Sequence, residues 1–135
     1  MEHGVFDLAG LEQFMQDLVD GGPTDSDHRA PAVIVEMPVD GSSADVIRAN
    51  RWQFRQVLTR GVNGILLCHA ENPEAIKAFV EVCRYPFQTQ SAVSYFEIGR
   101  HGSAGQPSAA PIWGVRYRNI WTKPIRGLWE NFCWA

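Results

Sequence analysis

Apolar residues recur along the first 87 positions in three helical patterns, which two continuous apolar runs separate. Asp7 is suited to cap the first helical pattern, and Gly21-Gly22-Pro23 ends it. The two runs are short and rich in aliphatic residues, many of them β-branched, which is typical of buried strands. The pattern therefore predicts helices over 8–19, 46–58 and 73–83, and strands over 32–39 and 64–68.

This order of elements indicates an α/β fold with a parallel sheet. The two strands are continuously apolar instead of alternating, as expected when helices cover both faces of a sheet. Val33 and Ile65 are separated by about 32 residues, a typical length for a strand with its crossover helix and loops. Such βα units build either an open doubly wound sheet or a barrel, and two strands alone complete neither.

The rest of the chain has a different character. Residues 88–114 are rich in Gly, Ser, Ala, Gln and Pro without sustained periodicity, and they predict a flexible insertion. Residues 115–135 form a Trp-rich tail with neither a helical nor a strand period. The sequence thus divides into an α/β domain over 1–87, the insertion and an aberrant tail.

Composition narrows the class of protein. The net charge is −3, so the chain offers no positive field for nucleic acid or an acidic membrane. No run of about 18 apolar residues and no secretion signal occurs. Three cysteines, Cys68, Cys83 and Cys133, lie in apolar settings and predict reduced packing residues in a cytoplasmic protein.

Several candidate functional residues fall near the expected strand ends. In parallel α/β folds the carboxyl ends of the strands share one face, so Glu2-His3, Glu36 and the His69–Glu71 segment are expected to open on the same side. His3 suits general-base chemistry, although a terminal histidine is more often only solvated. Glu36 fits a polar cleft or a structural ion pair equally well. His69 and Glu71 lack a third ligand of metal-site spacing and fit a loop histidine and a helix-entry carboxylate.

Four segments in order and at suitable spacing resemble the HpcH/HpaI aldolase/citrate lyase family. Residues 1–8, Met-Glu-His-Gly-Val-Phe-Asp-Leu, resemble the family's Asp-x-Glu-His-Gly segment at the end of the second barrel strand. Residues 31–39 and 61–67 resemble the third and fourth strands, and Arg84-Tyr85-Pro86 resembles an Arg-Tyr-Pro motif after the next helix. The resemblance implies that 1–87 is a partial (β/α)8 TIM barrel, about the second to fourth βα units.

The resemblance also implies a reaction. Members of this family are carbon–carbon lyases that act on 2-oxo or hydroxy-oxo acids through an enolate, which a divalent metal such as Mg or Mn stabilises. By resemblance, His3 is the catalytic base and Glu2 is its neighbour in the site. Glu36 stands where the family commonly has a substrate-binding arginine, and a carboxylate there would repel an anionic substrate.

The expected metal ligands have no counterpart before Ala135, so the resemblance predicts a truncated member that binds no metal and is inactive as an isolated chain. If the reading frame within the codons for 118–135 is shifted by one nucleotide, the translated sequence can resemble the family segment that leads into the fifth strand. This resemblance suggests a frameshift. The alternative reading is a non-catalytic α/β interaction module, or a half-barrel that complements a partner. Open sheet edges would then favour a homo-oligomer or aggregation.

Overall fold

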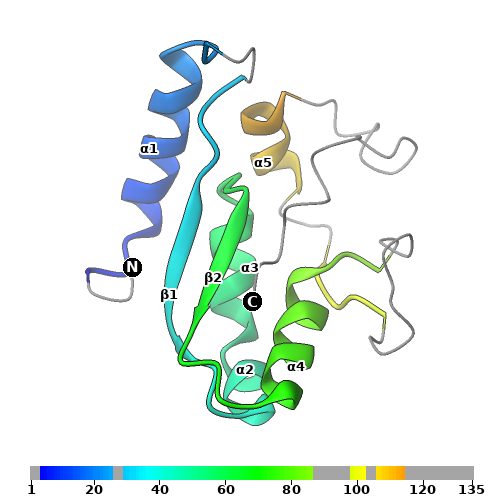
Figure 1. The fold of residues 1–135 in the computed structure, drawn as a ribbon. Helices are drawn as coiled ribbons and strands as arrows, with labels where there is room; N and C mark the ends of the chain where they lie inside the picture. Colours follow the sequence, from blue (N-terminus) through cyan, green and yellow to red (C-terminus); the bar gives the residue numbers. More distant parts are fainter. Residues whose placement is uncertain (1–3, 26–28, 87–97, 103–105, 115–135) are drawn as a thin grey trace.

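A computed structural model describes residues 4–25, 29–86, 98–102 and 106–114. The described residues form five α-helices and two parallel strands (Figure 1). In chain order these elements are α1 (Leu8–Asp20), β1 (Ile34–Asp40), α2 (Ala44–Ala49), α3 (Arg51–Leu58), β2 (Gly64–Cys68), α4 (Pro73–Cys83) and α5 (Gln106–Trp113).

The two strands pair in parallel, and α2 and α3 make the crossover between them. Ile34 pairs with Gly64 and Glu36 pairs with Leu66, after which the register shifts before Asp40 pairs with Cys68. Pro38 lies inside the irregular stretch, and it has no N–H group to donate to a ladder. The shift brings the last residue of β1 level with the last residue of β2.

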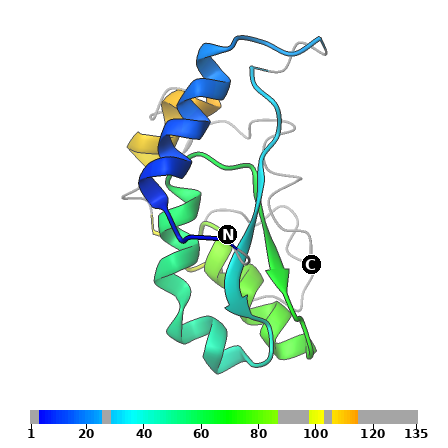
Figure 2. The ribbon, with the colours of Figure 1, turned by 90° about the vertical axis from the view of Figure 1, so that its left-hand side faces the viewer.

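Helices cover one face of this sheet. Figure 2 shows α2 and α3 on one side of the two strands and α4 behind them. Along β1 the residues Val35, Met37 and Val39 are buried, whereas Ile34 on the other face is 58% exposed. On β2, Leu66 is 41% exposed between the buried Ile65 and Leu67.

The prediction of a partial (β/α)8 barrel is therefore wrong for the part of the chain that the structure describes. The described strands form a two-stranded parallel sheet, and no barrel is present among them. The inference that helices cover both faces of the sheet is also wrong, because exposed side chains line the face opposite the helices. The apolar runs were misleading because exposed strand positions such as Ile34 and Leu66 are also apolar.

The crossover, expected as one helix over 46–58, is two helices that meet at Asn50. This residue leaves the helical region, with φ −96° and ψ 7°. Its side-chain Nδ2 donates to the carbonyl of Val46 at 2.9 Å, a local bond of the kind that competes with helix continuation. Ser43 caps the start of α2 by accepting from the Val46 N–H at 3.3 Å.

The core lies between the covered sheet face and these helices. Phe54 of α3 meets Phe79 of α4 edge to face, with ring centroids 5.4 Å apart, and both side chains are fully buried. Such an aromatic pair adds to the stability of a core a contribution beyond that of the apolar area that its rings bury. Of the described helices, α4 contributes the most buried residues, and it packs against α2 and α3.

Helix α5 lies within the segment 88–114 that was expected to be a flexible insertion, of which residues 88–97 and 103–105 are outside the described part. Trp113 on α5 is buried, and its Nε1 donates to the carbonyl of Gly61 at 2.8 Å. Gly61 has φ +87°, and a Cβ there would lie 2.7 Å from the Ile112 side chain. The insertion thus contains a helix that docks on the turn after α3.

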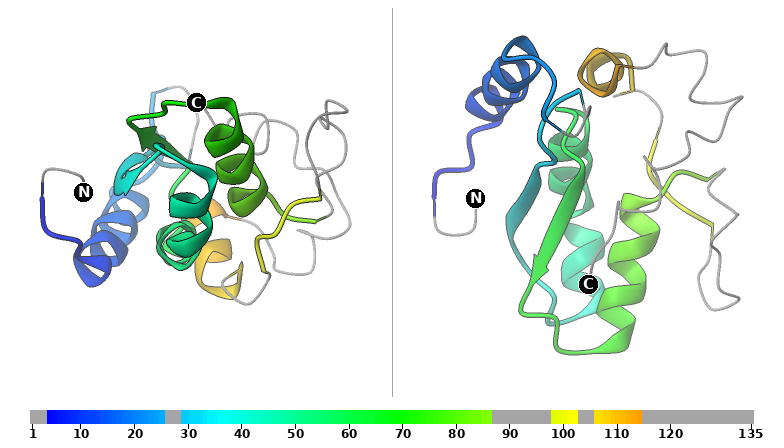
Figure 3. Two further views of the ribbon diagram at one scale, coloured as in Figure 1. Left: turned by 90° about the horizontal axis from the view of Figure 1, so that it is seen from below. Right: turned by 45° about the horizontal axis from the view of Figure 1, so that its top comes forward.

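Helix α1 contacts α3 and α5 and lies with α5 at one end of the fold (Figure 3). Its only buried residue is Met15. Asp7 caps it as the sequence predicted, accepting from the Gly10 N–H at 2.9 Å. Among the described residues, no helix is both long and apolar enough to span a membrane.

Candidate functional site

The carboxyl ends of the two strands bring an aspartate and a histidine together. Asp40 is the last residue of β1, and His69 follows the last residue of β2. Asp40 Oδ1 lies 2.6 Å from His69 Nδ1, and the two side chains are 62% and 63% exposed. This is the edge at which α/β proteins commonly place their functional groups.

Backbone contacts hold the two strand-end loops together. The Gly41 N–H donates to the Cys68 carbonyl at 2.8 Å, and the Glu71 N–H donates to the Gly41 carbonyl at 3.1 Å. A Cβ on Gly41 would lie only 2.8 Å from the Cα of Ala70, so this approach requires glycine. The contact between Asp40 and His69 therefore rests on paired backbones as well as on the side chains.

Hydrogen bonds of Asn72 also join the loop after β1 to the start of α4. The Nδ2 group of Asn72 donates to the Ser42 carbonyl at 2.5 Å, while its Oδ1 accepts from the Ala75 N–H at 2.8 Å. Asn72 is thus both the cap of α4 and a clamp on the loop after β1. The start of α4 is positioned at the same edge as the pair.

His69 has an unusual backbone conformation, with φ 49°. Among the described residues it is the only one other than glycine with a positive φ. A residue in this region costs free energy that the surrounding structure must offset, and such residues cluster at functional sites. His69 adopts this conformation in the loop where its imidazole contacts Asp40.

The pairing determines what the imidazole can do. An ionised carboxylate only accepts hydrogen bonds, so His69 donates its Nδ1–H to Asp40. In that tautomer Nε2 carries the lone pair, which is the arrangement of a histidine general base oriented by an acid. The arrangement can move a proton at the surface of the strand-end edge.

The charges around the pair are negative. Glu71 lies in the loop after His69, and Glu74 lies in the first turn of α4. Both are exposed, as is Asp40. Coulomb repulsion therefore disfavours an anionic ligand at this edge relative to a neutral one of the same shape.

Glu36 does not join the pair. It lies in the middle of β1, half-buried and in register with Leu66. Asp40 is four positions further along the strand, a rise of roughly 13 Å. The expectation that Glu36 and His69 would open at one strand end is therefore wrong, and Asp40 takes that place.

Asp40 was the residue that sequence reasoning missed. Its signal was its position at the end of the apolar run, immediately before Gly41. Glu2 and His3, the predicted catalytic residues, lie outside the described residues. Their assignment stays a prediction.

The resemblance gives the family's metal ligands no counterpart in this chain, so it implies no metal site among the described residues. No group of three or more His, Cys, Asp or Glu side chains among them could hold a metal ion. Asp40 and His69 come together, and no third His, Cys, Asp or Glu side chain of the described part of the chain completes a metal-binding group with them.

Comparisons with known proteins add no family to this picture. The sequence matches no protein-family model, and searches of the curated proteins and of the solved structures also find no match. The likeness to the HpcH/HpaI family therefore rests on the four sequence segments alone.

Proposed function

We propose that this chain transfers a proton to and from small 2-oxo or hydroxy-oxo acids at its strand-end edge, the acid–base part of carbon–carbon lyase chemistry. The 2.6 Å contact between Asp40 and His69 carries the proposal. The substrate class and the lyase reaction come from the resemblance to the HpcH/HpaI family. The proposed reaction takes place in the cytoplasm, the compartment that the sequence favours.

In the proposed step, His69 Nε2 takes a proton from the carbon next to the 2-oxo group. The C–H bond breaks, an N–H bond forms, and the electron pair moves onto the carbonyl oxygen to give an enolate. Asp40 accepts the Nδ1–H throughout and stabilises the imidazolium that forms. Return of a proton to the same carbon completes an exchange that consumes no substrate.

In the lyase family a divalent metal supplies the charge that stabilises the enolate. The described residues account for the proton transfer only. We therefore expect enolisation to be detectable and cleavage of a carbon–carbon bond to be absent in the isolated chain.

Proton exchange in D2O tests this function directly. Loss of the C3 proton signal of pyruvate, followed by NMR, is expected to be about ten-fold faster or more with the parent chain than with His69→Asn. Asparagine tolerates the positive φ at this position, so the variant removes the base while keeping the backbone. Glu36→Gln is the matched control, because that carboxylate lies on the same strand away from the pair, and it should exchange at the parent rate.

A comparison of an anionic with a neutral substrate tests the effect of the negative charges at the strand-end edge. Methyl pyruvate is neutral, so the carboxylates of Asp40, Glu71 and Glu74 should not repel it as they repel pyruvate. The His69-dependent rate is therefore expected to be higher for the ester, and the difference should shrink in high salt. Equal rates for the parent chain and His69→Asn with both substrates would refute the proposal.

A cleavage assay separates His69 from His3. We expect no release of pyruvate from a hydroxy-oxo acid with added Mg²⁺ or Mn²⁺. Release that His3→Ala abolishes and His69→Asn leaves intact would instead assign the base to His3.

The uncovered sheet face favours a second candidate function, self-association into a homo-oligomer. Ile34 and Leu66 expose apolar surface on that face, and each strand of the two-stranded sheet has one edge without a described neighbour. A second copy of the chain can extend such a sheet. Leu66→Lys should then lower the sedimentation-average mass, whereas Gln56→Lys, on an exposed position of α3, should leave it unchanged. A parent chain that stays monomeric across the concentration range would exclude this candidate.

A further inference from the structure

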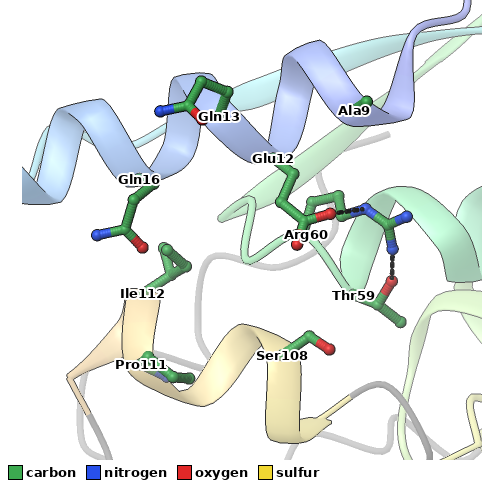
Figure 4. A pocket seen from close by; sticks show the side chains of 9 residues that line it. All are labelled: Ala9, Glu12, Gln13, Gln16, Thr59, Arg60, Ser108, Pro111 and Ile112. Atoms are coloured by element: carbon green, nitrogen blue, oxygen red, sulfur yellow. Dashed lines mark hydrogen bonds and ion pairs between the residues drawn. The ribbon is translucent and has the colours of Figure 1, made fainter.

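A pocket lies between α1, α5 and the turn that follows α3, away from the strand ends. Its volume is about 430 Å³, within the range of small-molecule sites. Figure 4 shows Glu12 and Gln16 reaching into it from α1, Arg60 and Thr59 from the end of α3, and Ile112 from α5. The pocket combines one acid, one base and an apolar wall.

An ion pair forms its charged side. Arg60 Nε lies 3.1 Å from Glu12 Oε2, with the two side chains 21% and 64% exposed. Arg60 Nη1 also donates to Thr59 Oγ1 at 2.9 Å. The guanidinium is thus held in one orientation by a neighbour on its own turn.

This ion pair is incompletely satisfied. The Nε atom of Arg60 is buried, yet among the described residues no acceptor meets it with hydrogen-bond geometry, and the nearby Glu12 carboxylate does not either. A buried donor without an aligned acceptor costs free energy that a ligand oxygen could recover. Charge therefore attracts the two groups to each other, while their poor alignment leaves part of the donor capacity of the guanidinium for a ligand oxygen beside the pair.

Further acceptors line the α1 side. The amide nitrogen of Gln13 donates to Asp17 at 2.7 Å, and that of Gln16 donates to Asp20 at 2.8 Å. These bonds leave the two amide oxygens as the acceptor ends of the side chains. The α1 side thus offers a carboxylate and two amide oxygens, which suit a ligand group with several N–H donors.

The wall opposite is apolar: Pro111 and Ile112 of α5 line it, and Ile112 points toward Gln16 of α1 (Figure 4). A ligand that fills the pocket must therefore present an aliphatic part as well as polar ends. A ligand of a single charge would satisfy one member of the Arg60–Glu12 pair and leave the other without its partner. A zwitterion can satisfy both.

We propose that the pocket between α1, α3 and α5 binds a free α-amino acid with an aliphatic side chain. The ligand carboxylate meets the Arg60 guanidinium, the ammonium group meets Glu12 and the amide oxygens of α1, and the side chain packs against Ile112. This site is separate from the strand-end edge, and the inference does not depend on the proton-transfer function.

Titration calorimetry with L-leucine tests the proposal. Binding to the parent chain is expected with a dissociation constant of roughly 1 mM or below, as for a small exposed site. 4-Methylpentanoate lacks the ammonium group and 3-methylbutylamine lacks the carboxylate, so each should bind at least ten-fold more weakly. Equal binding of all three compounds would show that apolar contact alone is responsible and would overturn the assignment.

Variants locate the site. Glu12→Gln and Arg60→Met should each weaken leucine binding by about ten-fold or more, the loss expected for one charge-assisted contact. Glu12 is largely exposed, so Glu12→Gln should fold normally even if Arg60→Met does not, and circular dichroism checks both. Asp45→Asn is the matched control, because it removes a carboxylate from the exposed Arg48–Asp45 pair outside the pocket.

The outcomes are decisive. Leucine binding that Glu12→Gln weakens and Asp45→Asn leaves unchanged supports the site. The proposal fails if the parent chain shows no heat of binding at leucine concentrations up to 20-fold above the expected dissociation constant. It also fails if the Glu12→Gln variant binds leucine as tightly as the parent chain does. Because the assay measures binding alone, its failure would not affect the proton-transfer function.

Discussion

The imidazole ring of His101 lies against the phenol ring of Tyr85, with ring centroids 4.5 Å apart and planes inclined at 44°. His101 is 2% exposed, and its Nδ1 has no hydrogen-bond partner among the described residues. Its backbone N–H donates to the Arg84 carbonyl at 2.8 Å. These contacts hold the residue against the end of α4 in a setting that favours the neutral ring.

Acid should therefore destabilise the fold through His101. Burial, with a smaller effect of the Arg55 guanidinium, lowers the pKa of His101 from 6.5 to about 4. The unfolded chain then binds a proton that the folded chain does not, so the free energy of unfolding falls as pH drops from about 6.5 to 4. The full effect of this residue is about 3 kcal/mol.

Urea unfolding at several pH values between 7 and 4 measures this contribution. Other groups titrate in the same range, so the informative quantity is the difference between the parent chain and His101→Phe, which keeps a ring against Tyr85. The variant should lose less stability on acidification. An identical pH dependence for both proteins would contradict the role of His101.

Removal of the Asp40 carboxylate should weaken the preference of His69 for the tautomer with its proton on Nδ1. In the parent chain the Nδ1–H donates to Asp40 at 2.6 Å, which selects that tautomer. In Asp40→Ala the population with the proton on Nδ1 is expected to fall, as measured by the ¹⁵N chemical shifts of the ring. Asp45→Ala removes an exposed carboxylate elsewhere and should leave the ring shifts unaltered.

Gly41→Ala should push the two strand-end loops apart. The added Cβ would lie 2.8 Å from the Cα of Ala70, a backbone atom that cannot rotate away. The expected loss of stability is about 1–3 kcal/mol, together with a weaker contact between Asp40 and His69. Gly102→Ala is the control, since no atom lies within 4 Å of its added Cβ. Parent-like stability for Gly41→Ala would mean that the loops are less tightly joined than the geometry indicates.

Loss of the aromatic pair in the core should be costly. Phe79→Ala removes a fully buried ring that meets Phe54 edge to face, and the expected destabilisation is about 3–5 kcal/mol in urea unfolding. Phe14 is 49% exposed on α1, so Phe14→Ala should cost much less. Similar costs at the two positions would argue against a core between α3 and α4.

Local sequence signals were reliable where they depended on neighbours in the chain. Asp7 caps α1 as predicted, and Asn72 caps α4 in the same way, because an N-cap bonds backbone groups within its own first turn. The two apolar runs do form parallel strands joined by a helical crossover. Asn50 divides that crossover because its side chain bonds a backbone carbonyl one turn earlier, a competition that apolar periodicity does not record.

The sequence by itself determined the helix caps, the apolar strands and their βα order, since these follow from side-chain chemistry over a few neighbouring residues. Only the tertiary structure decided that helices cover a single face of the sheet, that Asp40 instead of Glu36 meets His69, and that Arg60 meets Glu12. The physical reason is distance along the chain. Asp40 and His69 are 29 positions apart, and their contact depends on a register shift and on loop bonds that no local pattern encodes.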